Sequence, residues 1–253
     1  MNVLITGSSS GIGLEFARLY AAQENSLILV SRSKLALNDV KQELITKFNC
    51  KNVRIIPLDL SKHGSAEELH KKVPDIDILI NNAGVGDFGE CVSMPIEKIS
   101  AMISLNITAL TELCMLYGRD FKNAKKGGVL NVASIAAFQP LPYFGAYSAS
   151  KAYVLSFSLA LAAELKEYNV TVTCLCPGTT KTNFFSAGGR AEISQEKGIM
   201  SASTVAALGK SGLERKLLIV IPGRQNRFFA LAAKLLPHKI VLGYAKRMME
   251  EYR

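Results

Sequence analysis

Short apolar runs rich in Val, Ile and Leu recur along the chain, and each is followed by a turn and then by a stretch with helical spacing. These runs are nearly continuous in apolar content, which is typical of parallel strands buried on both faces. Right-handed crossovers between such strands place helices on both faces, so the pattern predicts an α/β fold with a doubly wound parallel sheet. The predicted strands are Asn2–Thr6, Ser26–Ser31, Asn52–Pro57, Asp77–Asn81, Gly128–Ala133, Thr171–Cys176 and Lys216–Ile221. The predicted helices are Gly11–Gln23, Lys34–Phe48, Ala66–Lys72, Ile96–Phe121 and Tyr147–Tyr168.

The length of 253 residues fits one large domain, which we divide into residues 1–223, carrying the sheet, and residues 224–253, a helical and basic extension of the same domain. We find no internal linker and no low-complexity segment. The stretch Asn183–Ser203 has glycines and polar residues with little periodicity, which predicts a mobile loop or a short helical excursion.

The composition argues against a membrane, secreted or metal-binding protein. The apolar fraction is 49%, yet uninterrupted apolar runs such as Leu27–Val30 and Ile76–Ile80 are only strand-sized, so we expect no membrane span. The first residues form a strand-like run with no basic leader, from which we expect no secretory signal and a cytoplasmic protein. The five cysteines fit a reducing compartment, and Cys174 and Cys176 are interpreted as two side chains on one strand face. We expect no metal site.

A glycine-rich turn, Thr6-Gly7-Ser8-Ser9-Ser10-Gly11-Ile12-Gly13, connects the first predicted strand to the first predicted helix. This is the place where a dinucleotide fold holds a pyrophosphate, because glycines allow close backbone approach and the helix N-terminus favours negative charge. The spacing departs from Gly-x-Gly-x-x-Gly, and taken alone the turn could be an ordinary tight loop. The candidate cofactor contacts in it are Gly7, Ser9, Ser10, Gly11 and Ile12.

The second strand ends in Ser31-Arg32-Ser33, where a site that prefers NAD usually places an acid against the ribose 2′-hydroxyl. A guanidinium at Arg32 suits a 2′-phosphate instead, so NADP(H) is favoured over NAD(H). The alternative is an ordinary surface arginine at a strand end.

Two further segments, Asp59-Leu60-Ser61 and Asn81-Asn82-Ala83-Gly84, follow the third and fourth strands. The carboxyl ends of parallel strands line the ligand crevice, so a carboxylate at Asp59 could face an adenine amino group and the second segment could pass beside a ribose. Asp59 could equally cap a helix over Ser61–Glu68. The candidate cofactor contacts are Asp59, Leu60, Asn82, Ala83 and Gly84.

Tyr147 and Lys151 lie at the start of a predicted helix, and their i, i+4 spacing places the phenol and the ammonium on one face. A nearby ammonium favours the phenolate and lowers a tyrosine pKa from about 10, which makes Tyr147 a usable proton donor and acceptor. Such a pair also occurs by chance on solvated helices. Ser134, at the end of the fifth strand, could hydrogen-bond a substrate oxygen.

These motifs in this order resemble the short-chain dehydrogenase/reductase family, in its compact single-domain branch, over about residues 1–182. The combined Thr-Gly-x-x-x-Gly-x-Gly, Asn-Asn-Ala-Gly and Ser…Tyr-x-x-x-Lys pattern is highly specific. The resemblance implies a Rossmann-type sheet of seven strands in residues 1–223 and an enzyme that moves a hydride between a nicotinamide cofactor and a carbonyl or alcohol. It further implies a homodimer or homotetramer and the catalytic residues Asn106, Ser134, Tyr147 and Lys151.

The family resemblance also assigns roles to individual positions. Asn106 would hold a water that links Lys151 to solvent, and Lys151 would bind the nicotinamide ribose. Many family members that use NADP(H) carry a base just before the second glycine, where this chain has Ser10, so the preference would depend on Arg32. The turn after the sixth strand would hold the nicotinamide carboxamide and phosphate through Pro177, Gly178, Thr180 and Thr182.

Two functions other than catalysis are also compatible with parts of the sequence. A catalytically silent cofactor-binding sensor or scaffold would not need Tyr147 or Lys151, whose presence argues against it. Nucleic-acid binding has only the basic charge in its favour, because no recognised motif accompanies it. Several apolar residues favour a lipophilic small-molecule substrate over a sugar, although they could also be packing or subunit contacts. They are Phe138, Leu141, Phe144, Phe184 and Phe185.

The net charge of +9 is concentrated in the tail, where residues 213–253 hold nine Lys and Arg against three Glu, a net +6. The tail has two apolar stretches, 227–236 and 240–249, on either side of Pro237, and each is too short to span a bilayer. One interpretation is a helical pair that packs on the domain or on a neighbouring subunit and extends the substrate pocket. The other is an amphipathic element in peripheral contact with anionic lipid.

Overall fold

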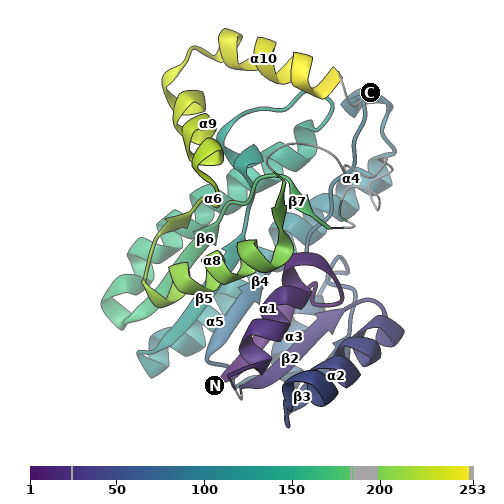
Figure 1. Ribbon diagram of the computed structural model, residues 1–253, viewed down its shortest axis with the longest axis vertical. Coiled ribbons are helices and arrows are strands. Elements are labelled where there is room, and N and C mark those ends of the chain that lie inside the picture. The colour runs from purple at the N-terminus through teal and green to yellow at the C-terminus, as the bar shows by residue number, and fades with distance from the viewer. Residues whose placement is uncertain (24, 183, 185–198, 251–253) are drawn as a thin grey trace.

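A seven-stranded sheet runs through the computed structural model, which describes residues 1–23, 25–182, 184 and 199–250 (Figure 1). All neighbouring strands are parallel, in the order β3-β2-β1-β4-β5-β6-β9. The predicted doubly wound parallel sheet is therefore confirmed. The strands are β1 Asn2–Thr6, β2 Ser26–Ser31, β3 Val53–Pro57, β4 Ile78–Asn81, β5 Gly127–Val132, β6 Val170–Leu175 and β9 Ile219–Val220.

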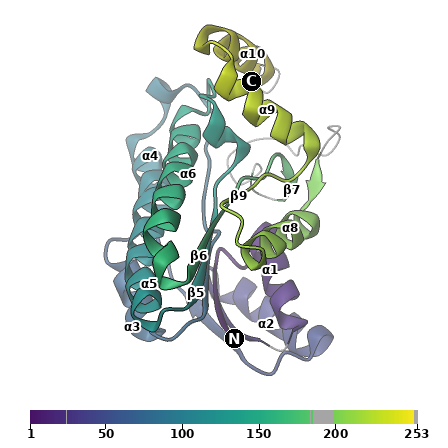
Figure 2. The ribbon, with the colours of Figure 1, turned by 90° about the vertical axis from the view of Figure 1, so that its left-hand side faces the viewer.

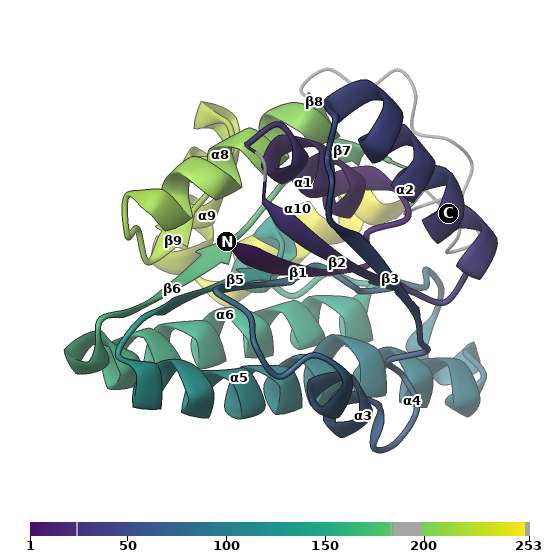
Figure 3. The same ribbon diagram turned by 90° about the horizontal axis from the view of Figure 1, so that it is seen from below.

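Helices cover both faces of this sheet (Figures 2 and 3). One face carries α1 Gly11–Ala21, α2 Lys34–Phe48 and α8 Ala202–Glu214, and the other carries α3 Ser65–Lys72, α4 Ile96–Ile103, α5 Leu110–Ala124 and α6 Gly145–Leu165. Short 3-10 turns span Cys91–Ser93, Ile135–Phe138 and Lys166–Tyr168. Each face of the sheet therefore has its own apolar core.

The pleat of β1 shows why the apolar runs do not alternate with polar residues. Val3 and Ile5 enter the core with α1, α2 and α8, whereas Leu4 enters the core with α3, α5 and α6. All three side chains are fully buried. A strand covered on both sides needs an apolar residue at every position, which is the pattern that predicted it.

The strand order reverses between β1 and β4, because the chain winds outward through β2 and β3 and then returns to the other side of β1. In an open parallel sheet this reversal leaves a crevice at the carboxyl ends of the strands. The segments that follow β1, β4, β5 and β6 all meet there.

The longest predicted helix, Ile96–Phe121, is interrupted. A π-helical turn over Ser104–Ala109 joins α4 to α5, a change of hydrogen-bonding register that apolar spacing does not reveal. Judged by length and composition only, the combined helical stretch Ile96–Ala124 is long and apolar enough to cross a membrane. The expectation that the chain has no segment of membrane-spanning length and hydropathy is therefore corrected. In the fold, Leu113, Tyr117 and Phe121 of this stretch pack in the core.

Several predicted boundaries were wrong in the C-terminal third. The predicted strand Lys216–Ile221 contracts to the two residues of β9, and α8 was not predicted. Most of the predicted loop Asn183–Ser203 lies outside the described residues, and its described end forms β8, Met200–Ser201, which pairs with β7, Thr180–Lys181, before α8 begins.

The tail folds as two helices, α9 Arg224–Leu235 and α10 His238–Glu250. They lie beyond the carboxyl ends of the strands, at the opposite end of the molecule from α2 and β3 (Figure 1). Pro237 separates them, as the sequence predicted. Ala245 and Met249 of α10 are buried in a third apolar cluster with Met102 of α4 and Phe144.

Candidate active site

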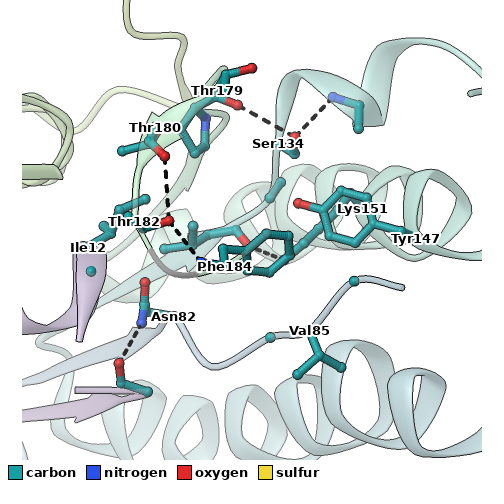
Figure 4. Close-up of a pocket in the computed structure, with 18 of the residues that line it drawn as sticks. Ile12, Asn82, Val85, Ser134, Tyr147, Lys151, Thr179, Thr180, Thr182 and Phe184 are labelled. Atoms are coloured by element: carbon teal, nitrogen blue, oxygen red, sulfur yellow. Dashed lines mark hydrogen bonds between the residues drawn. The ribbon is translucent and has the colours of Figure 1, made fainter. Parts of the chain in front are cut away.

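A cavity of about 600 Å³ lies at the carboxyl ends of the strands, and residues of both tail helices line it. Figure 4 shows part of this lining. Ser134, Tyr147 and Lys151 gather at one end of the view, and Ile12 and Asn82 lie at the other. Every residue predicted to contact a cofactor lines this cavity, namely Gly7, Ser9, Ser10, Gly11, Ile12, Arg32, Asp59, Leu60, Asn82, Ala83, Gly84, Tyr147, Lys151, Pro177, Gly178, Thr180 and Thr182.

The glycine turn after β1 has a backbone that only glycine adopts readily. Gly7 and Gly11 have φ of +64° and +56°, in the left-handed region. A Cβ on Gly13 would overlap the carbonyl oxygen of Gly7, so the start of α1 packs directly on the turn. The turn is thereby held against the N-terminus of α1, where a bound anion is stabilised.

Asn82 holds the glycine turn to the end of β4. Its Nδ2 donates to the carbonyl oxygens of Thr6 and Gly7 over 3.0 and 3.1 Å. In return, the Thr6 hydroxyl accepts from the backbone N–H groups of Asn82 and Ala83, both over 3.0 Å. These four bonds fix the two neighbouring strand ends on either side of the crevice, a structural role that the sequence had not suggested for Asn82.

Arg32 and Asp59 lie at the outer part of the cavity. Arg32 is exposed at the end of β2 and lines the cavity wall. The Asp59 carboxylate accepts from the Ser61 N–H over 3.0 Å and from its hydroxyl over 2.7 Å. Although burial opposes it, these bonds and the nearby Arg32 charge lower the pKa of Asp59. The alternative role for Asp59 as a helix cap is wrong, because α3 begins at Ser65 with Gly64 as its N-cap.

Tyr147 projects from the first turn of α6 into an aromatic environment. Its ring stacks on Phe144 with 4.3 Å between centroids and lies 5.5 Å from the ring of Phe184. Burial raises the pKa of Tyr147 to about 12, and a hydrogen bond with Ser134 acts in the opposite direction. The prediction that Lys151 lowers this pKa is wrong for the structure, because removal from water raises it and the opposing effect comes from Ser134.

Lys151 lies one turn further along α6, and its Nζ is 5.7 Å from the centroid of the Tyr147 ring. The ammonium is buried and donates to the carbonyl oxygen of Val132, the last residue of β5, over 2.8 Å. Burial lowers the pKa of Lys151 to about 8, although the nearby Cys174 and Cys176 act to raise it. The two sulfurs are 3.8 Å apart and lie on the same side of the sheet, with Cys176 one residue beyond the end of β6.

Ser134 lies two residues after the end of β5 and caps the 3-10 turn over Ile135–Phe138. Its hydroxyl accepts from the N–H of Ala136 over 3.1 Å and donates to the carbonyl of Pro177 over 3.5 Å. The Ser134 hydroxyl also acts, against the effect of burial, to lower the pKa of Tyr147. The predicted juxtaposition of Ser134, Tyr147 and Lys151 is therefore present.

Asn106 lies in the π-helical turn behind the cavity and does not line it. Its Oδ1 accepts from the N–H of Val85 over 3.0 Å, and its Nδ2 donates to the Val85 carbonyl and to Ser150 over 2.9 and 3.1 Å. Gly84 separates it from Lys151, since a Cβ there would lie 3.3 Å from both side chains. Asn106 thus supports the segment after β4 and the helix that carries Lys151.

The turn after β6 crosses over the glycine turn. Thr180 donates to the carbonyl of Gly178 over 2.9 Å, and the Thr182 hydroxyl accepts from the N–H of Phe184 over 3.3 Å. A Cβ on Gly11 would lie 3.0 Å from the methyl group of Thr182. This turn and the glycine turn therefore face each other across a narrow part of the cavity.

Sequence reasoning did not assign the residues that the tail contributes to the cavity. They are Gln225, Asn226, Phe229, Tyr244, Met248 and Met249. Asn226 donates to the Pro222 carbonyl over 2.7 Å and packs against Gly178, so the first turn of α9 touches the predicted cofactor turn. The apolar spacing of the tail predicted two helices, but nothing in it showed which side chains would face the site.

Comparison with known proteins gives consistent results. Residues 1–192 match the family described as short chain dehydrogenase. The chain is 30% identical over 192 residues, 74% of its length, to a Mycobacterium tuberculosis protein named probable oxidoreductase EphD, of which it covers 32%. It is 35% identical over 182 residues, 68% of its length, to a very-long-chain 3-oxoacyl-CoA reductase of Pyrenophora tritici-repentis, of which it covers 52%. The chain thus spans only a third to a half of these two relatives.

The fold is also similar to that of a solved structure, a short-chain dehydrogenase from Sphingobium yanoikuyae in complex with NADPH. The two are 29% identical with a TM-score of 0.84, and the alignment covers 100% of this chain and 96% of the other. The similarity therefore extends through the tail helices.

Proposed function

This chain belongs to the short chain dehydrogenase family, and from that membership together with its site we propose that it is an NADP(H)-dependent oxidoreductase that transfers a hydride between the nicotinamide and a carbonyl or alcohol. The observation that carries this proposal is the convergence of Ser134, Tyr147 and Lys151 on the same cavity as the glycine turn. A silent sensor or scaffold would have no need of this arrangement.

The residues of the cavity fit a dinucleotide. A Cβ on Gly7 would meet Asn82 and Ala83, and one on Gly13 would overlap the Gly7 carbonyl, so glycine at both positions lets the turn fold tightly on β4 and α1. The backbone of this turn lies at the N-terminus of α1, where a pyrophosphate is stabilised. Asp59 and the segment Asn82–Gly84 suit the adenosine half, and Gly178 and Thr180 suit the nicotinamide half. When bound, the cofactor supplies or accepts the hydride.

Tyr147 is the proposed general acid and base. With a pKa of about 12 its hydroxyl is protonated near neutral pH and can donate to the oxygen of a carbonyl substrate. Ser134 hydrogen-bonds the same oxygen and orients it. General acid catalysis of this kind contributes about 10²–10⁴ in rate.

Lys151 and Asn106 have different roles. The Lys151 ammonium faces the cavity, where it binds ribose hydroxyls and, when charged, favours the phenolate of Tyr147 in the oxidative direction. Asn106 is a positioning residue, because its amide holds Val85 and Ser150 and does not reach the cavity. The water predicted to link it to Lys151 stays a prediction.

Preference for NADP(H) is proposed from Arg32. Its exposed guanidinium at the end of β2 lines the cavity and can pair with a 2′-phosphate. A site that prefers NAD usually has an acidic residue at this position, where this chain has Arg32. The similar protein from Sphingobium yanoikuyae was solved with NADPH, which supports the proposal.

A lipophilic substrate is proposed from the inner end of the cavity. Leu141, Phe144 and Phe184 surround Tyr147, and Phe229 and Met248 extend the apolar wall from the tail. Such a wall gives a sugar few hydrogen-bond partners, whereas it packs well on an acyl chain or a bulky ketone. A cytoplasmic homodimer or homotetramer also stays a prediction.

Purified protein assayed with NADPH and NADH against a panel of carbonyls and alcohols tests this function. We expect oxidation of NADPH that depends on a ketone with apolar substituents, and much slower oxidation with hydrophilic sugars. Tight binding of either cofactor with no turnover across the panel would favour the silent sensor instead.

A further inference from the structure

Exposed apolar side chains are concentrated in the tail. Of the eighteen large hydrophobic residues that are exposed in the described part of the chain, seven lie within residues 224–250. They are Phe228, Leu231, Leu235, Leu236, Ile240, Leu242 and Tyr244. Exposed apolar side chains grouped in one segment are typical of an interaction site.

The apolar residues of α9 form a stripe. Phe228, Leu231 and Leu235 are spaced i, i+3 and i+7, so they share one face of the helix, with exposed fractions of 67%, 57% and 74%. Ala230, on another side of the helix, is buried. The stripe is therefore an outward face of α9 that the rest of the described chain does not cover.

Positive charge accompanies this stripe. The two helices carry six cations and a single acid, Glu250. Among the described residues only Lys246 of these cations is in an ion pair, with Glu250 over 3.7 Å. The cations are Arg224, Arg227, Lys234, Lys239, Lys246 and Arg247. Apolar and basic residues on one exposed helical element are the combination that binds the surface of an anionic bilayer.

A groove beside the stripe combines the same two chemistries. It has a volume of about 320 Å³ and lies between α9 and the edge strand β9, with Leu217, Ile221 and Leu231 in its lining. Arg227 and Lys234 also line it. An acyl chain with an anionic headgroup matches both the apolar lining and the two cations.

The same helices form a wall of the substrate cavity. Phe229 of α9 and Tyr244 of α10 line the cavity, and their rings are stacked with 6.3 Å between centroids. Met248 and Met249 of α10 line it as well. One side of the helical pair thus faces the cavity, and another carries the exposed stripe.

A second copy of the chain is a poorer partner for this surface. A symmetric dimer contact places the same patch of both copies together, so six cations from each would meet. Anionic lipid instead supplies the opposite charge and an apolar phase at the same boundary.

We propose that α9 and α10 dock in the interface of an anionic lipid bilayer, and that a lipophilic substrate enters the cavity from that side. The second part rests on the proposed function, whereas the docking does not. The stripe Phe228, Leu231 and Leu235 enters the acyl boundary, and the flanking cations approach the headgroups.

Co-sedimentation of the full-length protein with vesicles tests the docking. We compare phosphatidylcholine vesicles with vesicles that also contain phosphatidylserine, at low and high salt. Wild-type protein should pellet with the anionic vesicles at low salt, and high salt should weaken this binding, because salt screens the charges. Replacing Phe228, Leu231 and Leu235 together with Ser should reduce partitioning at least about tenfold.

Two control variants separate the stripe from general surface effects. The double variant Leu35→Ser and Val92→Ser removes exposed apolar residues elsewhere, with exposed fractions of 79% and 96%, and should bind as the wild type does. A triple variant in which Arg224, Lys239 and Arg247 become Gln should lose the preference for vesicles that contain phosphatidylserine. The matched charge control, in which Lys51, Lys71 and Lys166 become Gln, should keep it.

Circular dichroism and NADPH fluorescence titration show that each variant is folded, and neither readout depends on turnover. Wild-type protein that stays in the supernatant with anionic vesicles at low salt overturns the docking. So does equal loss of binding in the Leu35 and Val92 control. A shift of the stripe variant from dimer to monomer in ultracentrifugation, without vesicle binding by the wild type, would assign the face to a second copy.

Discussion

Lys151 donates from its buried ammonium to the carbonyl oxygen of Val132 over 2.8 Å, and this bond ties the first turns of α6 to the end of β5. Ser134 lies two residues after Val132. The bond from Lys151 to Val132 therefore helps to set the distance between Ser134 and the helix that carries Tyr147. The geometry of the site therefore depends on a lysine that has a structural partner as well as a face toward the cavity. Replacing Lys151 should therefore affect both the function and the stability of the protein.

Lys151→Met should reduce both turnover and cofactor affinity. Turnover is expected to fall about a hundredfold or more, because support for proton transfer at Tyr147 is lost. NADPH affinity should fall about tenfold, near 1.4 kcal/mol, because the ribose loses a partner. Steady-state kinetics and fluorescence titration measure the two effects. Lys166→Met, at the exposed end of the same helix, is the control, and unchanged cofactor affinity in Lys151→Met would rule out the ribose contact.

The lowered pKa of Lys151 predicts a rise in stability with pH. The folded state releases the proton near pH 8 and the unfolded chain near 10.5, so the unfolded state binds more protons between these values and the free energy of unfolding increases. From pH 7.5 to 10 the gain is about 2 kcal/mol, as the shift requires. Tyr147, with its raised pKa, acts in the opposite sense only above about pH 10.

Denaturant unfolding of wild type and Lys151→Met across this pH range measures the effect. The difference between the two proteins should change with pH by the predicted amount, because other titrating groups are common to both. A difference that stays constant from pH 7.5 to 10 would show that Lys151 keeps its ordinary pKa.

Gly13→Ala should abolish cofactor binding with little change elsewhere in the chain. A Cβ at this position overlaps the Gly7 carbonyl, which is backbone and can move only by displacing the glycine turn. Gly243→Ala is the matched control, because a Cβ there meets nothing within 4 Å and a helix favours Ala over Gly. NADPH titration distinguishes them, and normal binding by Gly13→Ala would show that the turn does not contact the cofactor.

Arg32 is predicted to set the cofactor preference. NADPH should bind at least tenfold more tightly than NADH, about 1.4 kcal/mol, and Arg32→Asp should reverse the order. Lys34→Asp makes the same charge change two residues away at a side chain that does not line the cavity, so it should keep the preference. Equal affinities of the unmodified protein for both cofactors would show that Arg32 faces solvent and takes no part.

The sheet and most of the site could be predicted from sequence because both depend on local patterns. Runs such as Leu27–Val30 are apolar at successive positions, and a motif that follows a parallel strand has to emerge at the carboxyl edge of the sheet. The sequence alone therefore places the glycine turn, Ser134 and Tyr147 at one edge of the sheet.

The helix α8 was missed because its glycines resemble loop signals. In the fold, Gly209 and Gly212 allow close packing, since a Cβ on Gly209 would lie 2.8 Å from Leu175 and one on Gly212 would overlap Val220. Tertiary packing outweighs helix propensity at these positions. The sequence also does not show how deeply a side chain is buried. Because burial raises the pKa of Tyr147, the sequence-based prediction of a lowered pKa was wrong.

The Tyr147 hydroxyl is proposed to transfer the proton, and Tyr147→Phe removes that hydroxyl while it keeps the stacking on Phe144. Tyr153→Phe is the control, since its hydroxyl lies on the exposed side of the same helix, 3.1 Å from Thr111. Steady-state turnover and NADPH titration are measured for both variants. We predict that Tyr147→Phe loses at least about a hundredfold in turnover, as removal of a general acid requires, while it binds NADPH normally and Tyr153→Phe stays fully active. Turnover by Tyr147→Phe above one hundredth of the wild-type rate would show that another group transfers the proton.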